Sequence, residues 1–195
     1  TGVQTCALPI YDVAVDGNYA YVVDWSGGFQ VIDISDPYNL SLAGSCGTPG
    51  YATGITLAGD YAFVGDYTSL QVIDISDPTN PTRVGSHGTS WNNYYPALCG
   101  DLVYLPDGYE GVSIFDVSDP TSPTYLGICD TPGAAYHVAF AGDHAYVADL
   151  SGGVQVLDIG DPTSPVIVGS CPTPGYGMWV AISGDHAFVA NYYDG

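Results

Sequence analysis

A pentapeptide of the type VIDIS recurs four times along the chain and limits its fold more than any other feature. Its aspartate stands at Asp33, Asp74, Asp116 and Asp158, so successive copies are 41, 42 and 42 residues apart. A repeat of this length is one supersecondary unit, which cannot bury its apolar faces alone and must stack on its neighbours. The period therefore predicts a repeat architecture over nearly the whole chain. It names no substrate and no reaction.

One repeat, residues 13–46, predicts four strands, which we name A to D. The apolar clusters VAV, YAYVV, FQVIDI and SLAG are short, rich in β-branched and aromatic residues, and separated by DGN, DWSGG and SDPYN. No window has a helical period of 3.6, and 26 glycines with 14 prolines among 195 residues leave no room for a long helix. We expect an all-β chain with almost no helix.

The third strand of each repeat favours a β-propeller. Its copies FQVIDI, LQVIDI, VSIFDV and VQVLDI are apolar at nearly successive positions, as in a strand that is buried between two neighbouring sheets. Four antiparallel strands in about 42 residues match a propeller blade better than leucine-rich, ankyrin or tetratricopeptide units. We predict an incomplete ring of four blades plus half a fifth. The repeats span about residues 11–52, 53–93, 94–135, 136–177 and, truncated, 178–195.

The most regular repeat units resemble a known family. AYVVDWSGGFQVIDISDP, AFVGDYTSLQVIDISDP and AYVADLSGGVQVLDIGDP are similar to the LVIVD repeat of bacterial and archaeal secreted or surface proteins. The resemblance covers residues 11–195 and implies a β-propeller outside the cell or on its surface, without a shared activity or shared catalytic residues. The third repeat departs most, because LVYLPDGYEGVSIFDV puts Pro106 at the end of strand B and Ser113 in place of glutamine.

The two ends of the chain depart from the repeat. Residues 1–10, TGVQTCALPI, resemble a translated sequencing adapter, so we predict a non-native leader followed by a partial propeller domain at residues 11–195. At the other end, NYYDG at 191–195 aligns with DLSGG at 149–153, inside the turn between strands B and C. We therefore expect a metagenomic fragment of a longer ring, whose remaining blades, signal peptide or anchor would lie in the missing parts.

The charge is strongly acidic. The chain has 21 acidic residues against one basic residue, Arg83, for a net charge of −20. Such a charge repels nucleic acid and anionic membrane surfaces, so neither a nucleic-acid partner nor membrane insertion is expected. All the acids except Glu110 are aspartates, and most occupy equivalent turn positions, where Asx-type hydrogen bonds form turns. Turn formation is the favoured interpretation, although salt or divalent cations would still relieve the repulsion.

The cysteines are expected to be free. Cys46, Cys129 and Cys171 occupy one repeat position, and His87 takes that position in the second repeat. Equivalent atoms of adjacent blades should lie roughly 10 Å or more apart, too far for a disulfide or a shared zinc ion. Cys99, at the end of an A strand, is interpreted as a small core residue.

The connections between strands predict where a partner would bind. Because strands alternate in direction, the B-to-C turns and the D-to-A connections should emerge on one face of the ring. That face varies between copies and is aromatic, and Tyr and Trp suit stacking on sugars or peptide surfaces. An alternative interpretation is that these rings only cover blade junctions. The candidate binding residues are Trp25, Tyr67, Tyr109, Trp91, Tyr95, His137 and Trp179.

The same turns offer weak candidates for calcium. Each B-to-C turn opens on an aspartate, namely Asp24, Asp66, Asp107 and Asp149, whose carboxylate could bind calcium together with carbonyl oxygens. Each turn has only one obvious carboxylate, however, so capping of the turn is the favoured role. No other metal or cofactor is expected.

Two functional classes are consistent with these patterns. The favoured hypothesis is a non-catalytic extracellular binding or scaffold propeller that contacts protein or glycan partners through its aromatic face. The alternative is a propeller hydrolase or lyase in which His137 works with Asp12 or Asp130 as acid and base. The single arginine excludes an arginine cluster of the sialidase kind, and no nucleophile elbow, P-loop or HExxH helix is present. We therefore assign no catalytic residues.

Overall fold

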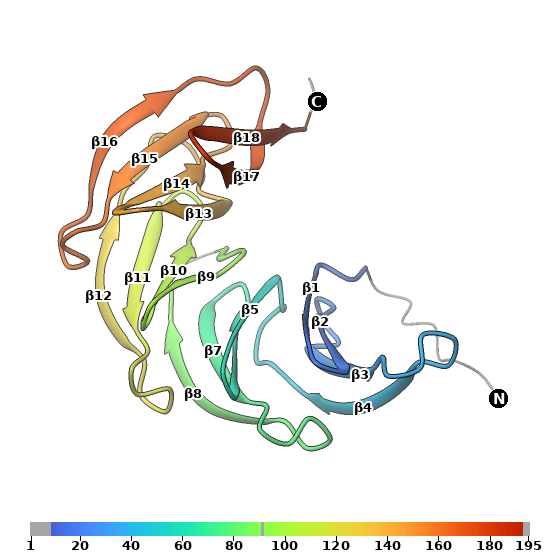
Figure 1. Cartoon of the computed structure of the whole chain (residues 1–195). Helices are drawn as coiled ribbons and strands as arrows, with labels where there is room; N and C mark the ends of the chain where they lie inside the picture. The colour runs from blue at the N-terminus through green and yellow to red at the C-terminus, as the bar shows by residue number, and fades with distance from the viewer. Residues whose placement is uncertain (1–8, 91, 193–195) are drawn as a thin grey trace.

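The structure is a computed structural model that describes residues 9–90 and 92–192, and every regular element in these residues is a β-strand (Figure 1). Four sheets of four antiparallel strands follow one another along the chain, and a two-stranded hairpin follows them. The predicted all-β repeat fold is thus confirmed. The predicted leader lies almost wholly outside the described residues, and its origin stays a prediction.

Each sheet is one blade, whose strands A to D are adjacent in chain order. Blade 1 comprises β1 (Asp12–Asp16), β2 (Tyr19–Val23), β3 (Phe29–Asp33) and β4 (Ser41–Cys46). Blade 2 comprises β5 (Gly54–Ala58), β6 (Tyr61–Gly65), β7 (Ser69–Asp74) and β8 (Thr82–Gly88). Blade 3 comprises β9 (Ala97–Cys99), β10 (Leu102–Pro106), β11 (Val112–Asp116) and β12 (Thr124–Cys129). Blade 4 comprises β13 (His137–Ala141), β14 (His144–Ala148), β15 (Val154–Asp158) and β16 (Val166–Cys171). The hairpin comprises β17 (Gly177–Ser183) and β18 (His186–Asn191).

Local turn chemistry sets the connections within a blade. Strands A and B are joined by two residues that start with a glycine at positive φ, between 53° and 60°, and a glycine reaches this left-handed region without steric cost. Between strands C and D, the Asp77 carboxylate accepts hydrogen bonds from the Thr79 amide at 3.0 Å and the Thr79 hydroxyl at 2.7 Å. Asp119 and Asp161 repeat this arrangement. These bonds hold the pKa of all three carboxyl groups below the usual value, and they confirm the interpretation of these aspartates as turn formers.

The apolar core lies between blades. One cluster joins blades 1 and 2, for example through Phe29 and Ile73, and a second joins blades 2 and 3. A third cluster joins blades 3 and 4. The C strands of blades 2 and 3 are buried at nearly every residue, as their continuous apolar runs predict: β7 is buried at five of its six residues and β11 at four of its five. Each blade therefore obtains its core from its neighbours.

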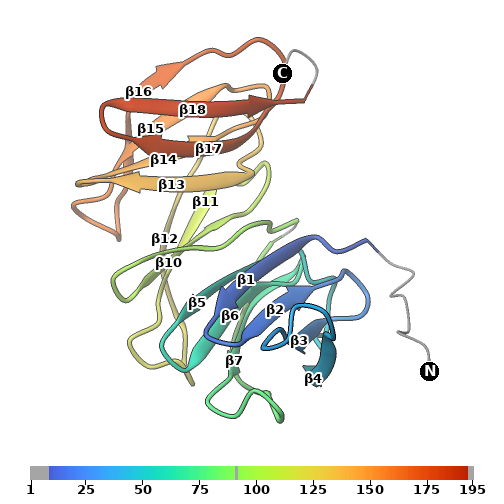
Figure 2. The same ribbon diagram turned by 45° about the vertical axis from the view of Figure 1, so that its right-hand side comes forward.

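The blades lie side by side in an open arc (Figures 1 and 2). The A strands β1, β5, β9, β13 and β17 are neighbours along the inner side of the arc, and the D strands lie on the outer side. Within the described residues the sheets do not close into a ring, in agreement with the predicted incomplete propeller.

A glycine in the D strand of blades 1, 2 and 3 allows the C-to-D loop of the next blade to approach closely. A Cβ atom added at Gly44 would lie 2.5 Å from the Pro78 carbonyl oxygen and 2.8 Å from Pro81 Cδ, both in the C-to-D loop of blade 2. At Gly85 the added atom would overlap the Pro120 carbonyl oxygen of blade 3. Each loop thus rests on the backbone of the preceding blade.

We expect Gly85→Ala to lower the free energy of unfolding by about 1 to 3 kcal/mol, because the methyl group would force blades 2 and 3 apart. Gly169→Ala is the matched control, since its Cβ would meet only Val156 of its own blade, at 3.6 Å. Alanine at this second site should be neutral or slightly stabilising. Urea unfolding of both variants measures the difference, and equal effects would contradict the role assigned to the glycine.

Candidate binding face

Backbone pairing shows that the B-to-C turns and the D-to-A connections share one face. Trp25, in the first B-to-C turn, forms an isolated antiparallel bridge with Ala52 in the connection to blade 2, with N–O distances of 3.1 and 3.0 Å. Equivalent bridges join Gly108 to Ala135 and Leu150 to Gly177. The predicted grouping of the two sets of connections is confirmed, and we call their common surface the BC/DA face.

The aspartates that open the B-to-C turns are buried and at most 2% exposed. Asp66 Oδ2 accepts a hydrogen bond from the Gly50 amide at 3.2 Å, and Asp149 Oδ2 accepts one from the Gly133 amide at 2.8 Å. Gly50 and Gly133 belong to the connections that enter the same two blades. Burial raises the pKa of Asp149, and hydrogen bonds from Thr131 and Gly133 oppose this shift. These aspartates therefore fasten a connection to a turn, in addition to ordering the turn itself.

The four calcium candidates do not come together. Asp24, Asp66, Asp107 and Asp149 stand in four different blades. In the part of the chain that the structure describes, no group of three or more His, Cys, Asp or Glu side chains could hold a metal ion. Calcium binding by a single turn stays a prediction. Cys46, Cys99, Cys129 and Cys171 are all free.

A first aromatic cluster, the Trp25 cluster, consists of Tyr11, Trp25, Tyr51 and Tyr67. The indole of Trp25 is parallel to the ring of Tyr51, with centroids 4.5 Å apart and an interplanar angle of 6°, and it stacks on Tyr11 at 4.8 Å. Tyr67 meets Trp25 and Tyr51 edge-on. A hollow of about 410 Å³ beside the cluster is lined by Tyr51 and Tyr67. Tyr11 and Tyr51 are 37% and 46% exposed, so the cluster offers ring surface to a partner.

The backbone under this cluster is strained. Trp25 and Tyr67 have φ values of 59° and 73°, in the left-handed region that bulky L residues rarely adopt. The equivalent position is Gly108 in blade 3, with φ of 57°, and Leu150 in blade 4, with φ of 40°, so the left-handed conformation belongs to the turn, and only a glycine adopts it freely. Each bulky side chain here costs on the order of 1 kcal/mol or more. The turn itself needs only a glycine, so its geometry does not explain the aromatic rings.

A second aromatic cluster, the inner-strand cluster, brings together three predicted site residues. His137 stacks on Trp179 at 3.7 Å with an interplanar angle of 25°, and Tyr95 meets Trp179 edge-on at 4.9 Å. Tyr136 lies 4.3 Å from Tyr94 and 5.5 Å from Tyr95, measured between ring centroids. Burial raises the pKa of the Tyr95 and Tyr136 hydroxyl groups, so both are protonated at neutral pH.

Side chains that begin the A strands link one blade to the next. Asp12 Oδ2 accepts a hydrogen bond from the Ile55 amide of blade 2 at 3.0 Å. At the equivalent position of blade 4, His137 Nδ1 accepts one from the Val180 amide at 3.5 Å. Because Nδ1 is the acceptor, the proton of the neutral imidazole is on Nε2. Burial lowers the pKa of His137 to about 4 and raises the pKa of Asp12.

Blade 2 lacks this hydrogen bond to the next blade, because both the acceptor and the donor residue are different. Gly54 stands where Asp12 and His137 stand in their blades, and it has no acceptor side chain. The donor position on the next blade is Pro96, which has no amide hydrogen. A Cβ atom at Gly54 would lie 2.6 Å from Tyr95 Cα, so the two backbones approach closely instead.

The residues of the enzymatic alternative do not form a pair. Within residues 9–90 and 92–192, no hydrogen bond joins His137 to Asp12 or Asp130. Asp12 begins blade 1, whereas His137 begins blade 4. Asp130 is exposed in the connection after β12. The arrangement therefore offers no preassembled acid and base.

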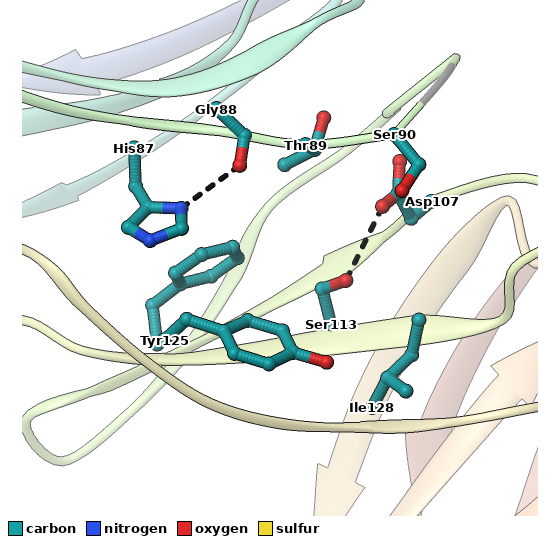
Figure 3. Close-up of a pocket in the computed structure, with 9 residues that line it drawn as sticks. His87, Gly88, Thr89, Ser90, Asp107, Ser113, Tyr125 and Ile128 are labelled. Carbon is teal, nitrogen blue, oxygen red and sulfur yellow. Dashed lines mark hydrogen bonds between the residues drawn. The ribbon is translucent and has the colours of Figure 1, made fainter.

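Other predicted site residues stand apart from the clusters. Tyr109 is 79% exposed, and no ring of the described residues stacks on it. Trp91 lies outside the described residues. Sequence reasoning missed Tyr11 and Tyr51, although the recurrence of tyrosine in TPGY at Tyr51 and Tyr176 was a usable signal. It also missed a cleft of about 350 Å³ between blades 2 and 3 (Figure 3).

Consecutive four-stranded antiparallel sheets with apolar clusters between them define the β-propeller class. The chain belongs to the LVIVD repeat family, whose model matches residues 10–48, 49–89, 97–131, 132–173 and 174–194. The sequence-based resemblance is thereby confirmed. No curated protein matches the chain.

Solved structures share the fold at low identity. A protein from Lactobacillus plantarum is 16% identical with a TM-score of 0.82, over 93% of this chain and 64% of its own. A functionally unknown protein from Desulfotomaculum acetoxidans is 13% identical with a TM-score of 0.80, over 96% of this chain and 64% of its own. The computationally designed Ika8 protein is 12% identical with a TM-score of 0.75, over 92% and 54%. This chain therefore spans between about half and two thirds of each of these three proteins.

None of the described residues forms a helix of the length and apolarity that would cross a membrane.

The lowered pKa of His137 predicts a pH-dependent stability. The folded protein favours the neutral imidazole, with a pKa of about 4 against 6.5 for an ordinary histidine, so the unfolded chain binds the proton first as the pH falls. Relative to His137→Asn, which keeps an acceptor but does not titrate, the wild type should lose on the order of 2 to 3 kcal/mol between pH 6.5 and pH 4. Urea unfolding at several pH values measures this difference. Parallel pH profiles would show that His137 is not held neutral.

Proposed function

We propose that the protein is a non-catalytic binding propeller that acts outside the cell and contacts a protein or glycan partner through the aromatic BC/DA face. The observation that carries this proposal is the Trp25 cluster, whose stacked aromatic rings stay partly exposed on this face. Glycine at Gly108 shows that the same turn forms without an aromatic side chain. An exposed aromatic cluster that the turn does not require supports a role in recognition.

The geometry of the Trp25 cluster suits a flat partner surface. Aromatic rings contribute a large contact area at a low cost in side-chain entropy, and they stack on sugar rings and on apolar peptide surfaces. The hollow between Tyr51 and Tyr67 would admit one protruding group of the partner. The net charge of −20 favours neutral or basic partners over sulfated or other anionic ones.

Membership of the LVIVD repeat family supports the extracellular location, because the family resemblance implies secreted or surface proteins. The inner-strand cluster would extend the same contact surface toward the inner side of the arc, where Trp179 is 41% exposed. The partner would then touch several blades at once. Such contact across blades is typical of the extended binding surfaces of repeat proteins.

Trp25→Gly and Tyr67→Gly test the proposal without the usual risk of unfolding, because glycine relieves the left-handed backbone at both positions. We expect each variant to fold at least as stably as the wild type and to lose about tenfold or more in partner capture on arrays of neutral glycans and basic proteins. Tyr38→Ala is the control, since Tyr38 is 98% exposed in a C-to-D loop on the other face. Capture that survives both glycine substitutions, or that falls equally with Tyr38→Ala, would refute the proposal.

A further inference from the structure

The cleft between blades 2 and 3 is shown in Figure 3. None of its lining residues belongs to either aromatic cluster. One side is the end of β8 with the residues that follow it, and the other side is formed by β11, β12 and the B-to-C turn of blade 3. Its volume is about 350 Å³, enough for a small organic group. The residues that matter for its chemistry are His87, Asp107, Ser113, Phe115 and Tyr125.

Two departures from the repeat mark this cleft. The C-strand position of Ser113 is a glutamine in the other complete blades, at Gln30, Gln71 and Gln155. The D-strand position of His87 is a cysteine in the other blades, at Cys46, Cys129 and Cys171. Both departures line the same cleft, and no other pair of adjacent complete blades combines them.

The missing glutamine would occupy the space beneath the turn. In blade 4 its amide nitrogen donates a hydrogen bond to the B-to-C turn, from Gln155 Nε2 to the Gly152 carbonyl oxygen at 2.7 Å, and in blade 2 Gln71 Nε2 donates to Ser69 Oγ, directly after the turn, at 2.6 Å. In blade 1 it reaches the turn aspartate, with Gln30 Nε2 3.4 Å from Asp24 Oδ2. The shorter Ser113 leaves this space open and donates to Asp107 Oδ2 at 3.2 Å (Figure 3).

The chemistry of the cleft is that of a cation receptor. Asp107, Ser113 and Phe115 form its floor and are at most 3% exposed. His87 lies over Phe115, with ring centroids 5.1 Å apart, and Tyr125 completes an aromatic wall. His87 Nδ1 donates to the Gly88 carbonyl oxygen at 2.8 Å, so Nε2 of the neutral ring is an acceptor. The only basic residue of the chain, Arg83, is not part of the lining.

We infer that this cleft binds an alkylammonium group. The ammonium would occupy the space that the repeat's glutamine side chain fills elsewhere, with the Asp107 carboxylate as its counterion and Ser113 as a second acceptor. The methylene chain next to it would pack on the aromatic wall, where a cation is also attracted by the ring faces. Two sources share this chemistry: a free aliphatic amine and a lysine side chain of a protein, which this lysine-free chain cannot itself supply.

Titration with n-butylammonium chloride, followed by NMR shifts of the amides around the cleft and by calorimetry, tests the inference. A single small contact of this kind should give a dissociation constant on the order of 1 mM. The isosteric neutral alcohol n-butanol should bind at least about tenfold more weakly, because it lacks the charge that pairs with Asp107.

A second titration, with a lysine tripeptide whose termini are blocked, distinguishes the two sources of the alkylammonium group. Binding tighter than that of butylammonium identifies a lysine side chain as the source, and weaker or equal binding identifies a free amine.

Ser113→Gln is the decisive variant, because it restores the residue of the other blades and should leave the fold intact. It should fill the cleft and reduce amine binding about tenfold or more. Asp107→Asn keeps the shape and should weaken binding similarly, whereas Gln155→Ser in blade 4 is a control that leaves this cleft unchanged. The inference fails if the wild type binds neither amine, if n-butanol binds as well as butylammonium, or if Ser113→Gln binds the amine undiminished. None of these outcomes would bear on the proposed binding by the Trp25 cluster, because the cleft and the cluster have no residue in common.

Discussion

Apolar packing between neighbouring sheets is the interaction on which the rest of the structure depends. Strand β7 is buried at five of its six residues because blades 1 and 3 cover its two faces, and its buried Leu, Val and Ile side chains each contribute about 1.5 to 3 kcal/mol only when the neighbouring blade is present. The other repeated contacts adjust a distance that this packing has already set. The C-to-D loop rests on Gly85 of the preceding blade, and Asp66 holds the connection that enters its own blade. Stability is therefore a property of interfaces rather than of single blades.

The parts of the fold that local sequence encodes were predictable. Strand number, blade order and the common face of two sets of connections follow from residue alternation and turn chemistry, as at Gly17 and Asp77. Contacts between distant segments were not predictable in the same way. Asp149 was interpreted as a turn residue and weak calcium candidate, but it is buried because the connection at Gly133 crosses it. The cleft was missed because it needs His87 in one blade and Ser113 in the next, and neither residue indicates it alone.

Positions that have the same residue in each blade and positions that differ between blades have different roles. Positions that repeat in every blade form turns, packed strands and close approaches, so a change there alters stability. The departures do not serve packing: Ser113 leaves open the space that a glutamine fills in the other blades, and the ring of Trp25 is not required by a turn that Gly108 also forms. Asp12 and His137 stand between these groups, because different side chains at one position accept the same kind of interblade hydrogen bond. Recognition is thus expected where the repeat is broken on the BC/DA face and in the cleft.

Native-state hydrogen exchange, resolved by residue, tests most directly whether the interfaces between blades hold the structure together. Blades 2 and 3 are covered on both faces by described neighbours, whereas blade 1 and the β17–β18 hairpin are covered on one. The account predicts the slowest exchange in the hydrogen-bonded amides of β6, β7, β10 and β11, and faster exchange in β2, β3 and β18. Uniform protection across all blades, or the strongest protection in blade 1, would contradict it, because each blade would then be stable without its neighbours.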